Sequence, residues 1–399
     1  MSKLKQLIQK HCPNGVEYKK LEELLDYEQP TKYIVESTEY DNFYDIPVLT
    51  AGQTFILGYT NENFGIYKAS QKKPAIIFDD FTTSFHWVDF EFKIKSSAMK
   101  MLRPKKNFNG SFRYIYYAMK CIKYEAMDHT RHWISKYSQF EIPFPPLKVQ
   151  EEIVYILDTL TSYSAELQAE LQAELQARRE QYEYYRNKLL AFDKPGKESV
   201  SWMKMSDIGS FIRGKRFVRT DIVNDGIPCI HYGDIYTYYG LYATQSKGKL
   251  RSELASKMRY AHKNDVVIVA AGENKEDIGI GVAWLGENPA AVHDACFIFR
   301  SDLYPQYVSH YLRSTYYHKQ IVKYVSEGKI CSISAKGLGN AIIPIPTYEE
   351  QVRIATLLNK FDSLICDLSQ GLPAEISAVQ EQYEYYRNKL LSFKKIKEA

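Results

Sequence analysis

Three residues near the start of the chain, Asp80, Glu91 and Lys93, have the types and the order of the metal-binding set found in many nucleases. If residues 91–93 form a strand, the alternation of side chains places Glu91 and Lys93 on one face. Such a triplet also arises easily by chance in a chain with 25% charged residues. The pattern alone therefore does not predict a nuclease.

Other motifs of nucleic-acid enzymes are incomplete. Residues 288–290 (Asn-Pro-Ala) come nearest to the motif with which adenine methyltransferases hold a flipped base, but they lack its second proline and its aromatic residue. No GxxxxGK[ST] loop is present, and residues 279–281 (Gly-Ile-Gly) are typical of a turn. His129 and His132 have no cysteine or acidic partner at a metal-ligand spacing. We expect no catalytic centre and no metal in this chain.

Positive charge is gathered in short segments, although the net charge is only +4. The clusters are residues 93–106, which hold six Lys or Arg and no acid, a second set at Arg213, Lys215, Arg216 and Arg219, and a third at Lys68, Lys72 and Lys73. Basic clusters in otherwise neutral domains favour a polyanionic partner. A solvated charged face is the alternative for each cluster.

An internal repeat organises the chain. Residues 180–192 read EQYEYYRNKLLAF, and residues 381–393, which lie 201 positions later, read EQYEYYRNKLLSF. The same offset aligns 142–193 with 343–394 without an insertion. Earlier, residues 16–18 resemble residues 200–202 at an offset of 184. The plan is variable, repeated, variable, repeated.

The repeated segments carry the periodicity of long helices. From Ile153 to Phe192 and from Ile354 to Phe393, mostly apolar residues recur at steps of 4 and 3, and the two copies match step for step. Each helix would have about 42 residues and a length of roughly 63 Å. The matching seams suggest that the helices pack together and form a spacer, and ordinary core helices are the alternative.

The two repeated segments differ near their middles. The first contains three AELQ tetrads at residues 165–176, whereas the second contains glycine and proline at residues 371–373. Proline removes a helical hydrogen bond, so we predict a kink or break near 371–373 and a continuous first helix. The tetrads are either a device that adjusts length or a neutral expansion of good helix formers.

The variable halves are rich in Tyr, Phe, Ile and Val in short runs that Gly, Pro and Asn interrupt, which is typical of short strands in a mixed α/β domain. Residues 111–122 and 304–325 are expected to be helices. The predicted divisions are a first variable domain (1–146), the first long helix (147–192), a linker (193–199), a second variable domain (200–346) and the second long helix (347–399).

Composition places the chain among folded cytoplasmic proteins. No apolar run reaches the ~18 residues of a membrane span, and the N-terminal residues lack the apolar stretch of a signal peptide. The cysteines have no CxxC spacing and are expected to be reduced thiols; they are Cys12, Cys121, Cys229, Cys296, Cys331 and Cys366.

Taken together, the chain resembles the specificity subunits of type I restriction–modification systems. The resemblance rests on the doubled plan, on the IPxP-x4-Q-x2-I hinges at 142–153 and 343–354, and on the QYEYYRNKLL tails at 181–190 and 382–391. Similar segments of the variable halves are 46–67, 76–100, 226–240 and 276–286. The resemblance implies an α+β fold in which two mixed α/β target-recognition domains are separated by two long antiparallel coiled-coil helices with pseudo-twofold symmetry.

The same resemblance implies the partners. Each recognition domain would read one half of a split, asymmetric site on double-stranded DNA, since half-site spacing mirrors protein geometry. The helices would dock methyltransferase subunits, two in number, and restriction (motor) subunits would join the full complex. S-adenosylmethionine, ATP and Mg²⁺ are expected on those partner subunits and none on this chain. A coiled-coil adaptor with two protein-binding heads and a self-sufficient DNA-modifying enzyme remain alternatives.

Residue type selects the candidate DNA contacts, because phosphates need Lys or Arg and base edges need polar side chains. A surface polar group without a DNA contact is the alternative for each. The candidates in the first domain are Lys68, Gln71, Lys72, Thr82, Thr83, Arg131 and His132. Those in the second domain are Arg213, Lys215, His231, Asn274, Lys275, Ser332, Ser334 and Lys336.

Overall fold

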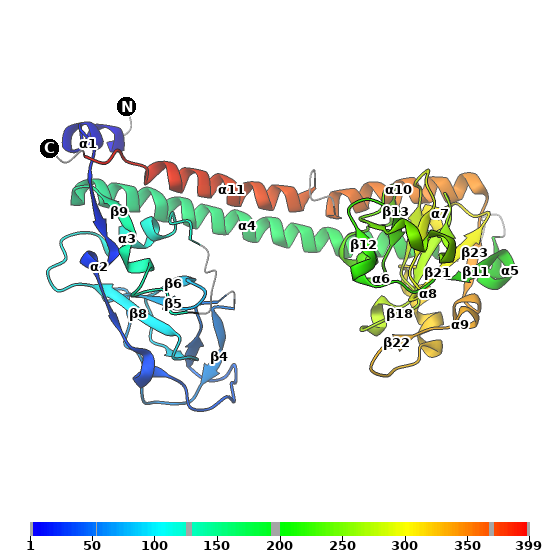
Figure 1. The fold of residues 1–399 in the computed structure, drawn as a ribbon, viewed down its shortest axis with the longest axis horizontal. Helices are drawn as coiled ribbons and strands as arrows, with labels where there is room; N and C mark the ends of the chain where they lie inside the picture. The colour runs from blue at the N-terminus through cyan, green and yellow to red at the C-terminus, as the bar shows by residue number, and fades with distance from the viewer. Residues whose placement is uncertain (1–2, 53, 125–129, 193–199, 367–370, 397–399) are drawn as a thin grey trace. The chain divides into compact units, whose positions relative to one another are not determined.

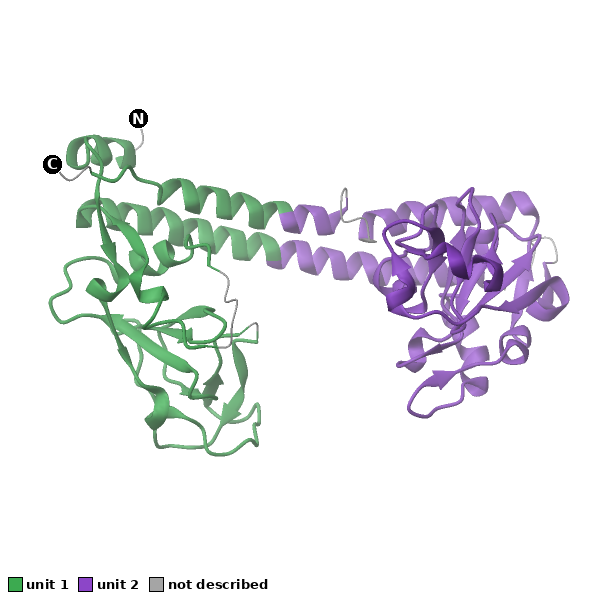
Figure 2. Ribbon diagram, viewed as in Figure 1, with its two compact units in different colours: residues 1–168, 378–399 green, residues 169–377 purple. Residues whose placement is uncertain are grey.

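The computed structural model describes residues 3–52, 54–124, 130–192, 200–366 and 371–396 (Figure 1). Contacts within the chain divide it into unit 1, residues 1–168 with 378–399, and unit 2, residues 169–377 (Figure 2). The predicted linker 193–199 and His129 lie outside the described residues.

Unit 1 contains a four-stranded antiparallel sheet in the order β2-β8-β5-β6, a three-stranded sheet β4-β3-β7 and the pair β1-β9. The strands are β1 (Glu17–Lys20), β2 (Leu25–Glu28), β3 (Ile46–Leu49), β4 (Ile56–Thr60), β5 (Ala75–Asp79), β6 (Phe85–Val88), β7 (Lys93–Ile94), β8 (Met99–Pro104) and β9 (Glu141–Phe144). The helices are α1 (Lys3–His11), α2 (Leu21–Leu24) and α3 (Phe112–Met119), with 3-10 turns η1 (Pro30–Tyr33) and η2 (Tyr137–Gln139).

Strand β5 explains the apolar run at 75–78. Ile76 and Phe78 belong to the core that includes α3 and the first turns of the long helix, whereas Ala75 and Ile77 belong to a second core. Successive side chains of a strand point to opposite faces, so a strand that is buried on both faces is apolar at every position. The four-stranded sheet is therefore the middle layer of the first recognition domain.

Unit 2 holds two five-stranded sheets, β11-β21-β17-β19-β14 and β12-β15-β13-β20-β16, and the pairs β10-β23 and β18-β22. The strands are β10 (Ser201–Lys204), β11 (Gly209–Arg213), β12 (Ile222–Val223), β13 (Ile227–Ile230), β14 (Tyr242–Ala243), β15 (Gly248–Leu250), β16 (Tyr260–Ala261), β17 (Val266–Val269), β18 (Ala271–Gly272), β19 (Gly281–Trp284), β20 (Ala290–Val292), β21 (Cys296–Ser301), β22 (Cys331–Ser332) and β23 (Ile342–Ile345). The helices are α5 (Met205–Ile208), α6 (Tyr232–Thr237), α7 (Pro305–Tyr311), α8 (Thr315–Ile321), α9 (Ala335–Gly339) and α10 (Tyr348–Cys366), with 3-10 turns η3 (Arg219–Asp221), η4 (Ser252–Lys257), η5 (Lys275–Asp277) and η6 (Val322–Tyr324).

The prediction of one continuous long helix is confirmed for the first repeated segment. The second repeated segment contains two described helices near the predicted kink or break. Helix α4 (Leu147–Leu190) is continuous and contributes to both units. The second copy consists of α10 and α11 (Leu372–Leu390), and residues 367–370 between them lie outside the described residues. The carbonyl of Gly371 accepts from Ala374 N at 2.9 Å, so a new helix begins at the predicted place. Proline in a first helical turn removes no intrahelical hydrogen bond.

Helix pairing is visible within each unit. In unit 1, Thr161 Oγ1 lies 2.9 Å from Tyr383 OH, and Gln168 Nε2 donates to Gln380 Oε1 at 3.1 Å. The later residue of α4 contacts the earlier residue of α11, so these two helices are antiparallel. In unit 2, the ring of Tyr185 on α4 stacks on Phe361 of α10, with centroids 5.7 Å apart.

In each recognition domain the first and last strands form an antiparallel pair. In unit 1, Tyr18 on β1 lies opposite Pro143 on β9. In unit 2, Trp202 on β10 lies opposite Pro344 on β23. The offset of 184 at the start of the repeat and the offset of 201 at the hinge are therefore both confirmed by strand register.

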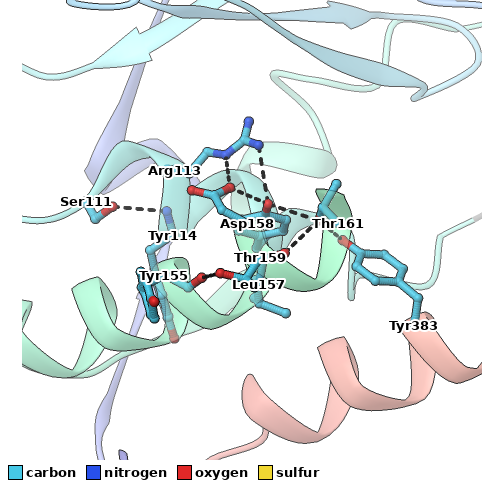
Figure 3. A network of polar contacts seen from close by, with 10 residues as sticks. Ser111, Arg113, Tyr114, Tyr155, Leu157, Asp158, Thr159, Thr161 and Tyr383 are labelled. Carbon is cyan, nitrogen blue, oxygen red and sulfur yellow. Dashed lines mark hydrogen bonds and ion pairs between the residues drawn. The ribbon is translucent and has the colours of Figure 1, made fainter. Parts of the chain in front are cut away.

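A polar network joins the recognition domain of unit 1 to its helices (Figure 3). Asp158 on α4 accepts from Arg113 Nε at 2.8 Å and from Tyr117 OH at 2.5 Å, both on α3. Thr161 continues the network to Tyr383 on α11. Unit 2 repeats the arrangement with other residues, because His310 Nε2 lies 2.8 Å from Asn359 Oδ1 and its Nδ1 lies 3.2 Å from Tyr182 OH.

Candidate nucleic-acid interface

The first group of candidates in unit 1 lies in a turn just before β5. Lys68, Gln71 and Lys72 are exposed, and a small bridge between Ser70 and Lys73 fixes the backbone of the turn. The ammonium of Lys68 pairs with Glu91 at 2.5 Å. Gln71 and Lys72 therefore project from an ordered turn, whereas Lys68 must leave an ion pair before it can meet a phosphate.

The second group forms the tip of the β5–β6 hairpin. Asp79 Oδ1 accepts from the backbone N–H groups of Phe81 at 2.8 Å and Thr82 at 2.9 Å, which fixes the turn. Thr83 has a φ of +59° and is 8% exposed. A β-branched residue in the left-handed region is strained, and such strain persists only where the surroundings impose it. Thr82 is thus presented to solvent, whereas the Thr83 side chain is turned inward.

Burial also separates Arg131 from His132. Arg131 is exposed, but His132 has no exposed surface and its Nδ1 lies 3.0 Å from Tyr124 OH. A fully buried imidazole offers no atom to DNA in this conformation. His132 is therefore a core residue of the loop before the hinge, and we withdraw it as a candidate contact.

The nuclease-like triplet is dispersed. Asp80 pairs with Lys100 at 3.0 Å and accepts from Trp133 N at 2.8 Å, whereas Lys93 pairs with Glu62 at 2.5 Å. Each member of the triplet has its own structural partner, since Glu91 pairs with Lys68. Across the described ranges, no three His, Cys, Asp or Glu side chains gather closely enough to hold a metal ion.

In unit 2 the main feature is a pair of histidines that follow two paired strands. Ile230 at the end of β13 lies opposite Val292 at the end of β20, and the two strands are parallel. His231 and His293 are the next residues of each chain segment, and their rings lie 4.7 Å apart. Parallel strands are joined by long connections, so this juxtaposition could not be read from local sequence.

The two histidines belong to an aromatic cluster. Tyr232 lies 4.5 Å from the ring of His231 and 5.3 Å from that of His293, and Phe217 packs edge-on to His293 at 5.1 Å. His231 also caps α6, since its Nδ1 accepts from Gly233 N at 3.3 Å. Burial, and then the neighbouring His293, lowers the pKa of His231, and burial lowers the pKa of His293. These shifts favour the neutral form of both imidazoles, and a neutral imidazole has one donor and one acceptor nitrogen.

This cluster lines a cleft of about 770 Å³, and an adjoining cleft of about 580 Å³ shares His231 and Tyr232. Basic side chains at the cleft are Arg216, Arg219 and Lys329, and acidic ones are Glu273 and Asp294. Basic side chains and aromatic rings therefore share one concave surface, and nucleic-acid recognition uses such a combination.

Of the remaining candidates of unit 2, one lines the adjoining cleft and others lie on strands and loops near it. Asn274 lines the adjoining cleft, and Lys275 forms an ion pair with Glu327. Ser332 on β22 lies opposite Ala271 on β18, so the loops that carry these residues meet. Arg213 and Lys215 are exposed at the end of β11, and Arg213 Nε donates to Asp294 O at 2.9 Å. His231 itself is only 8% exposed.

Ser334 and Lys336 belong to a different surface, the start of the short helix α9. Ser334 Oγ accepts from Gly337 N at 3.1 Å and caps that helix, while Lys336 is exposed. The cleft residues that the sequence patterns did not select include His293, Phe217 and Lys329. The basic cluster at residues 213–219 surrounds Phe217, but no local signal marked His293.

Within the part of the chain that the structure describes, no helix is long and apolar enough to cross a membrane. The described cysteines Cys12, Cys121, Cys229, Cys296 and Cys331 are free thiols.

Comparison with known proteins gives one family. The family model described as type I restriction modification DNA specificity domain matches residues 13–177 and again residues 197–378. The chain is 40% identical over 399 residues to the specificity subunit of the type I restriction enzyme EcoR124I/EcoR124II of Escherichia coli, with 95% of each chain covered. It is 33% identical over 350 residues to a putative type I restriction enzyme specificity subunit of Haemophilus influenzae, with 86% of each covered.

A solved chain, described as "Structural basis underlying complex assembly and conformational transition of the type I R-M system", has the same fold. It aligns with a TM-score of 0.65 at 16% identity, covering 95% of this chain and 98% of that one. At this identity the likeness speaks to the fold alone.

Proposed function

Because the chain belongs to the family of type I restriction–modification DNA specificity subunits, we propose that it reads a bipartite, asymmetric site on double-stranded DNA. Unit 1 would read one half-site and unit 2 the other. The observation that carries the proposal is the contrast between matched scaffolds and unmatched reading surfaces. Both units share an antiparallel pair of first and last strands and a polar network that joins the domain to its long helices. The surfaces differ, because unit 1 presents the tip of the β5–β6 hairpin and unit 2 presents the histidine cleft.

An asymmetric DNA site has two different half-sites, so it requires two different reading surfaces, which can be carried by scaffolds of the same kind. Phosphate contacts by Lys72 or Arg216 would set the register, and base edges would be read by groups such as Thr82 and the paired histidines. Since Nδ1 of His231 already accepts from Gly233 N, its Nε2–H is the group that would donate to the major-groove edge of a base pair, while His293 packs beside it. We expect the cleft of unit 2 to carry much of the specificity for its half-site.

The docking role follows from the repeated helices. The outer surface of the QYEYYRNKLL tail is the same in both copies, with Tyr184 and Tyr385 both 59% exposed. A folding core needs no identical exposed residues, so a surface that occurs twice suits two copies of one partner. We propose that two methyltransferase subunits dock there and that restriction subunits join through them.

The chain itself would be non-catalytic and cytoplasmic. Asp80, Glu91 and Lys93 are committed to separate partners, which supports the absence of a nuclease centre in the described residues. S-adenosylmethionine, ATP and Mg²⁺ would therefore bind the partner subunits.

The test is genome-wide mapping of methylated adenines in cells that carry the wild-type gene, no gene, or the variant His293→Ala. We expect one split motif with unlike halves to vanish without the gene. The variant should relax or lose one half only, because His293 belongs to one unit. Unchanged methylation in the deletion strain, with active methyltransferase present, would refute the specificity role and favour a coiled-coil adaptor.

A further inference from the structure

Two arginines at matched positions of the repeat are incompletely satisfied. Arg186 on α4 and Arg387 on α11 lie 201 positions apart. The guanidinium of Arg186 lies 5.1 Å from the ring centre of Tyr182, and that of Arg387 lies 5.8 Å from Tyr383. In both residues Nε is buried and has no hydrogen-bond partner among the described residues. Because the feature occurs in both copies, it belongs to the repeat and is no accident of one packing arrangement.

The hydroxyl and carboxylate groups near these arginines also bond to other residues. In unit 1, Tyr117, Asp158, Thr161 and Tyr383 bond to one another (Figure 3). In unit 2, Tyr182 bonds to His310, which bonds to Asn359. The described residues form no ion pair with Arg186, although it is only 8% exposed. A buried Nε–H of a charged guanidinium that lacks an acceptor is costly, and an ionised oxygen is the group that would offset this cost.

Each arginine lines a cleft in its own unit. Arg186 lines a cleft of about 360 Å³ whose other charged lining residues are the basic Arg313 and Lys275 and the acidic Glu183 and Glu276. Arg387 lines a cleft of about 660 Å³ together with Lys120 and Lys123. The charge in the second cleft is mainly positive, because Glu384 is its one acidic lining residue among those the structure describes. Both clefts therefore suit an anion.

The occupant must be the same in both units. The walls that come from the variable domains differ, since Lys120 and Lys123 face Arg387 whereas Arg313 and His318 face Arg186. The repeated wall is the same in both, and it includes Glu183 and its match Glu384. DNA half-sites that differ would have no need of matched arginines, whereas two copies of one partner would.

The surroundings favour a protein carboxylate over a DNA phosphate. The cleft of Arg186 has an apolar wall of Ile278, Ile321, Val322 and Val325. Just outside, Lys188 Nζ lies 3.4 Å from Tyr184 OH, and Lys389 Nζ lies 3.4 Å from Tyr385 OH. An apolar wall beside a cation and an exposed tyrosine is typical of a protein interface, where Tyr and Arg are enriched.

We propose that Arg186 and Arg387 form two matched carboxylate-binding sites, each of which takes one aspartate or glutamate side chain from one of two identical partner subunits. This inference rests on the proposed docking of two methyltransferase subunits. It adds the chemistry of the contact: a bidentate pair between a guanidinium and a carboxylate, formed twice.

The test uses the full chain and the purified methyltransferase subunit encoded with it, measured by isothermal titration and by native mass. The variants are Arg186→Gln, Arg387→Gln and both together, and Arg178→Gln is the control because it is an exposed arginine of the same helix. We expect each single variant to weaken one of two binding events about tenfold to a hundredfold, which is the scale of a charge-assisted hydrogen bond. The double variant should weaken both, and the control neither.

A fold-maintaining role predicts a different result in the free chain. If the arginines hold the fold, Arg186→Gln lowers the thermal midpoint, and that outcome would overturn the proposal. If they are carboxylate-binding sites, removing a buried charge that lacks a partner leaves the midpoint unchanged or higher. Arg186→Lys, which keeps the charge but not the planar pair, should bind at an intermediate strength.

Two further outcomes separate this proposal from its premise. Wild-type chain that binds two partner subunits, with both glutamine variants binding equally well, would refute the carboxylate-binding sites and leave the docking role intact. Wild-type chain that binds none would refute both. A loss of DNA affinity in Arg186→Gln with partner binding unchanged would assign the cleft to a phosphate and would also refute the proposal.

Discussion

Gln150 Oε1 accepts a hydrogen bond of 2.8 Å from the backbone N–H of Ser111, the residue that caps α3. The amide nitrogen of the same side chain donates to the carbonyl of Pro145 at 2.7 Å. Unit 2 repeats both bonds, since Gln351 accepts from Tyr304 N at 2.9 Å and donates to Pro346 O at 3.0 Å. The glutamine of the hinge motif thus fastens the first turn of each long helix to the start of a recognition-domain helix.

Replacing either glutamine should loosen one recognition domain from its helix. Gln150 has no exposed surface, so Gln150→Ala leaves the partly buried N–H of Ser111 and the buried carbonyl of Pro145 without partners. We expect a loss of about 2–4 kcal/mol in local stability, because each orphaned group costs about 1–3 kcal/mol. Hydrogen exchange at the Ser111 amide should rise accordingly, and Gln351→Ala should raise exchange at Tyr304.

Gln168→Ala is the matched control for the hinge. Gln168 bonds to Gln380 on the exposed face of the helix pair, so its loss should leave both amides protected. Equal protection in Gln150→Ala and in the control would contradict the role assigned to the hinge glutamine.

The scaffold was predictable because it is written twice in the sequence. The two copies of the hinge and tail revealed the offset of 201, and residues 16–18 and 200–202 revealed the offset of 184; the strand registers at Tyr18 and Trp202 agree with both. Local rules also predicted a kink or break near residues 371–373, where α11 begins at Leu372, since glycine and proline disfavour a helix interior. The segment 304–325 was expected as one helix, but it forms α7, α8 and a 3-10 turn, because Ser314 caps a new helix.

The binding surface was less predictable, for two physical reasons. Residue type does not reveal burial, so His132 and Thr83 were selected although their side chains are turned into the core. Long-range pairing is also invisible locally, so His293 was missed although it lies beside His231. A polar residue just after an apolar strand marks a strand end, but the partner strand has to be known before two such ends can be brought together.

Stability of unit 2 should fall in mild acid because of His310. Burial, the largest cause, lowers the pKa of His310 to about 3. The unfolded chain takes up this proton near pH 6.5, whereas the folded chain does not, so stability is complete above about pH 6.5 and declines towards pH 3. The expected slope is roughly 1.4 kcal/mol per pH unit for one group.

Chemical unfolding between pH 7 and pH 4 measures this slope, with His310→Gln as the comparison. The variant should be less stable at pH 7, since it loses the bond to Tyr182. It should also show a shallower decline, although not a flat one, because burial lowers the pKa of His318 and His293 as well. A decline of the same slope in both proteins would count against His310 as the cause.

Removal of a basic side chain from the cleft of unit 2 should change the salt dependence of DNA binding. Arg216 is exposed and lines the cleft beside the paired histidines. If it contacts a phosphate, Arg216→Gln should reduce the slope of log affinity against log salt by about 0.9. Binding titrations of the assembled complex at several salt concentrations provide the slope, and the mid-helix variant Arg178→Gln should leave it unchanged. A constant slope in Arg216→Gln would place the phosphate contacts elsewhere.

The AELQ tetrads at residues 165–176 lie within the continuous helix α4, where they are a natural place to alter its length. One added tetrad lengthens a helix by about 6 Å and rotates the downstream part of the chain by roughly 40° beyond a full turn. Since one base pair of DNA turns by about 34–36°, the second reading surface would be re-aimed by about one base-pair twist.

We expect insertion of one tetrad to change the gap between the methylated half-sites while both half-sites stay the same. Genome-wide mapping of methylated adenines measures the length of this gap directly. A gap that stays constant in such a variant would identify the tetrads as a neutral expansion, whereas a change in either half-site would show that the helix also shapes the reading surfaces.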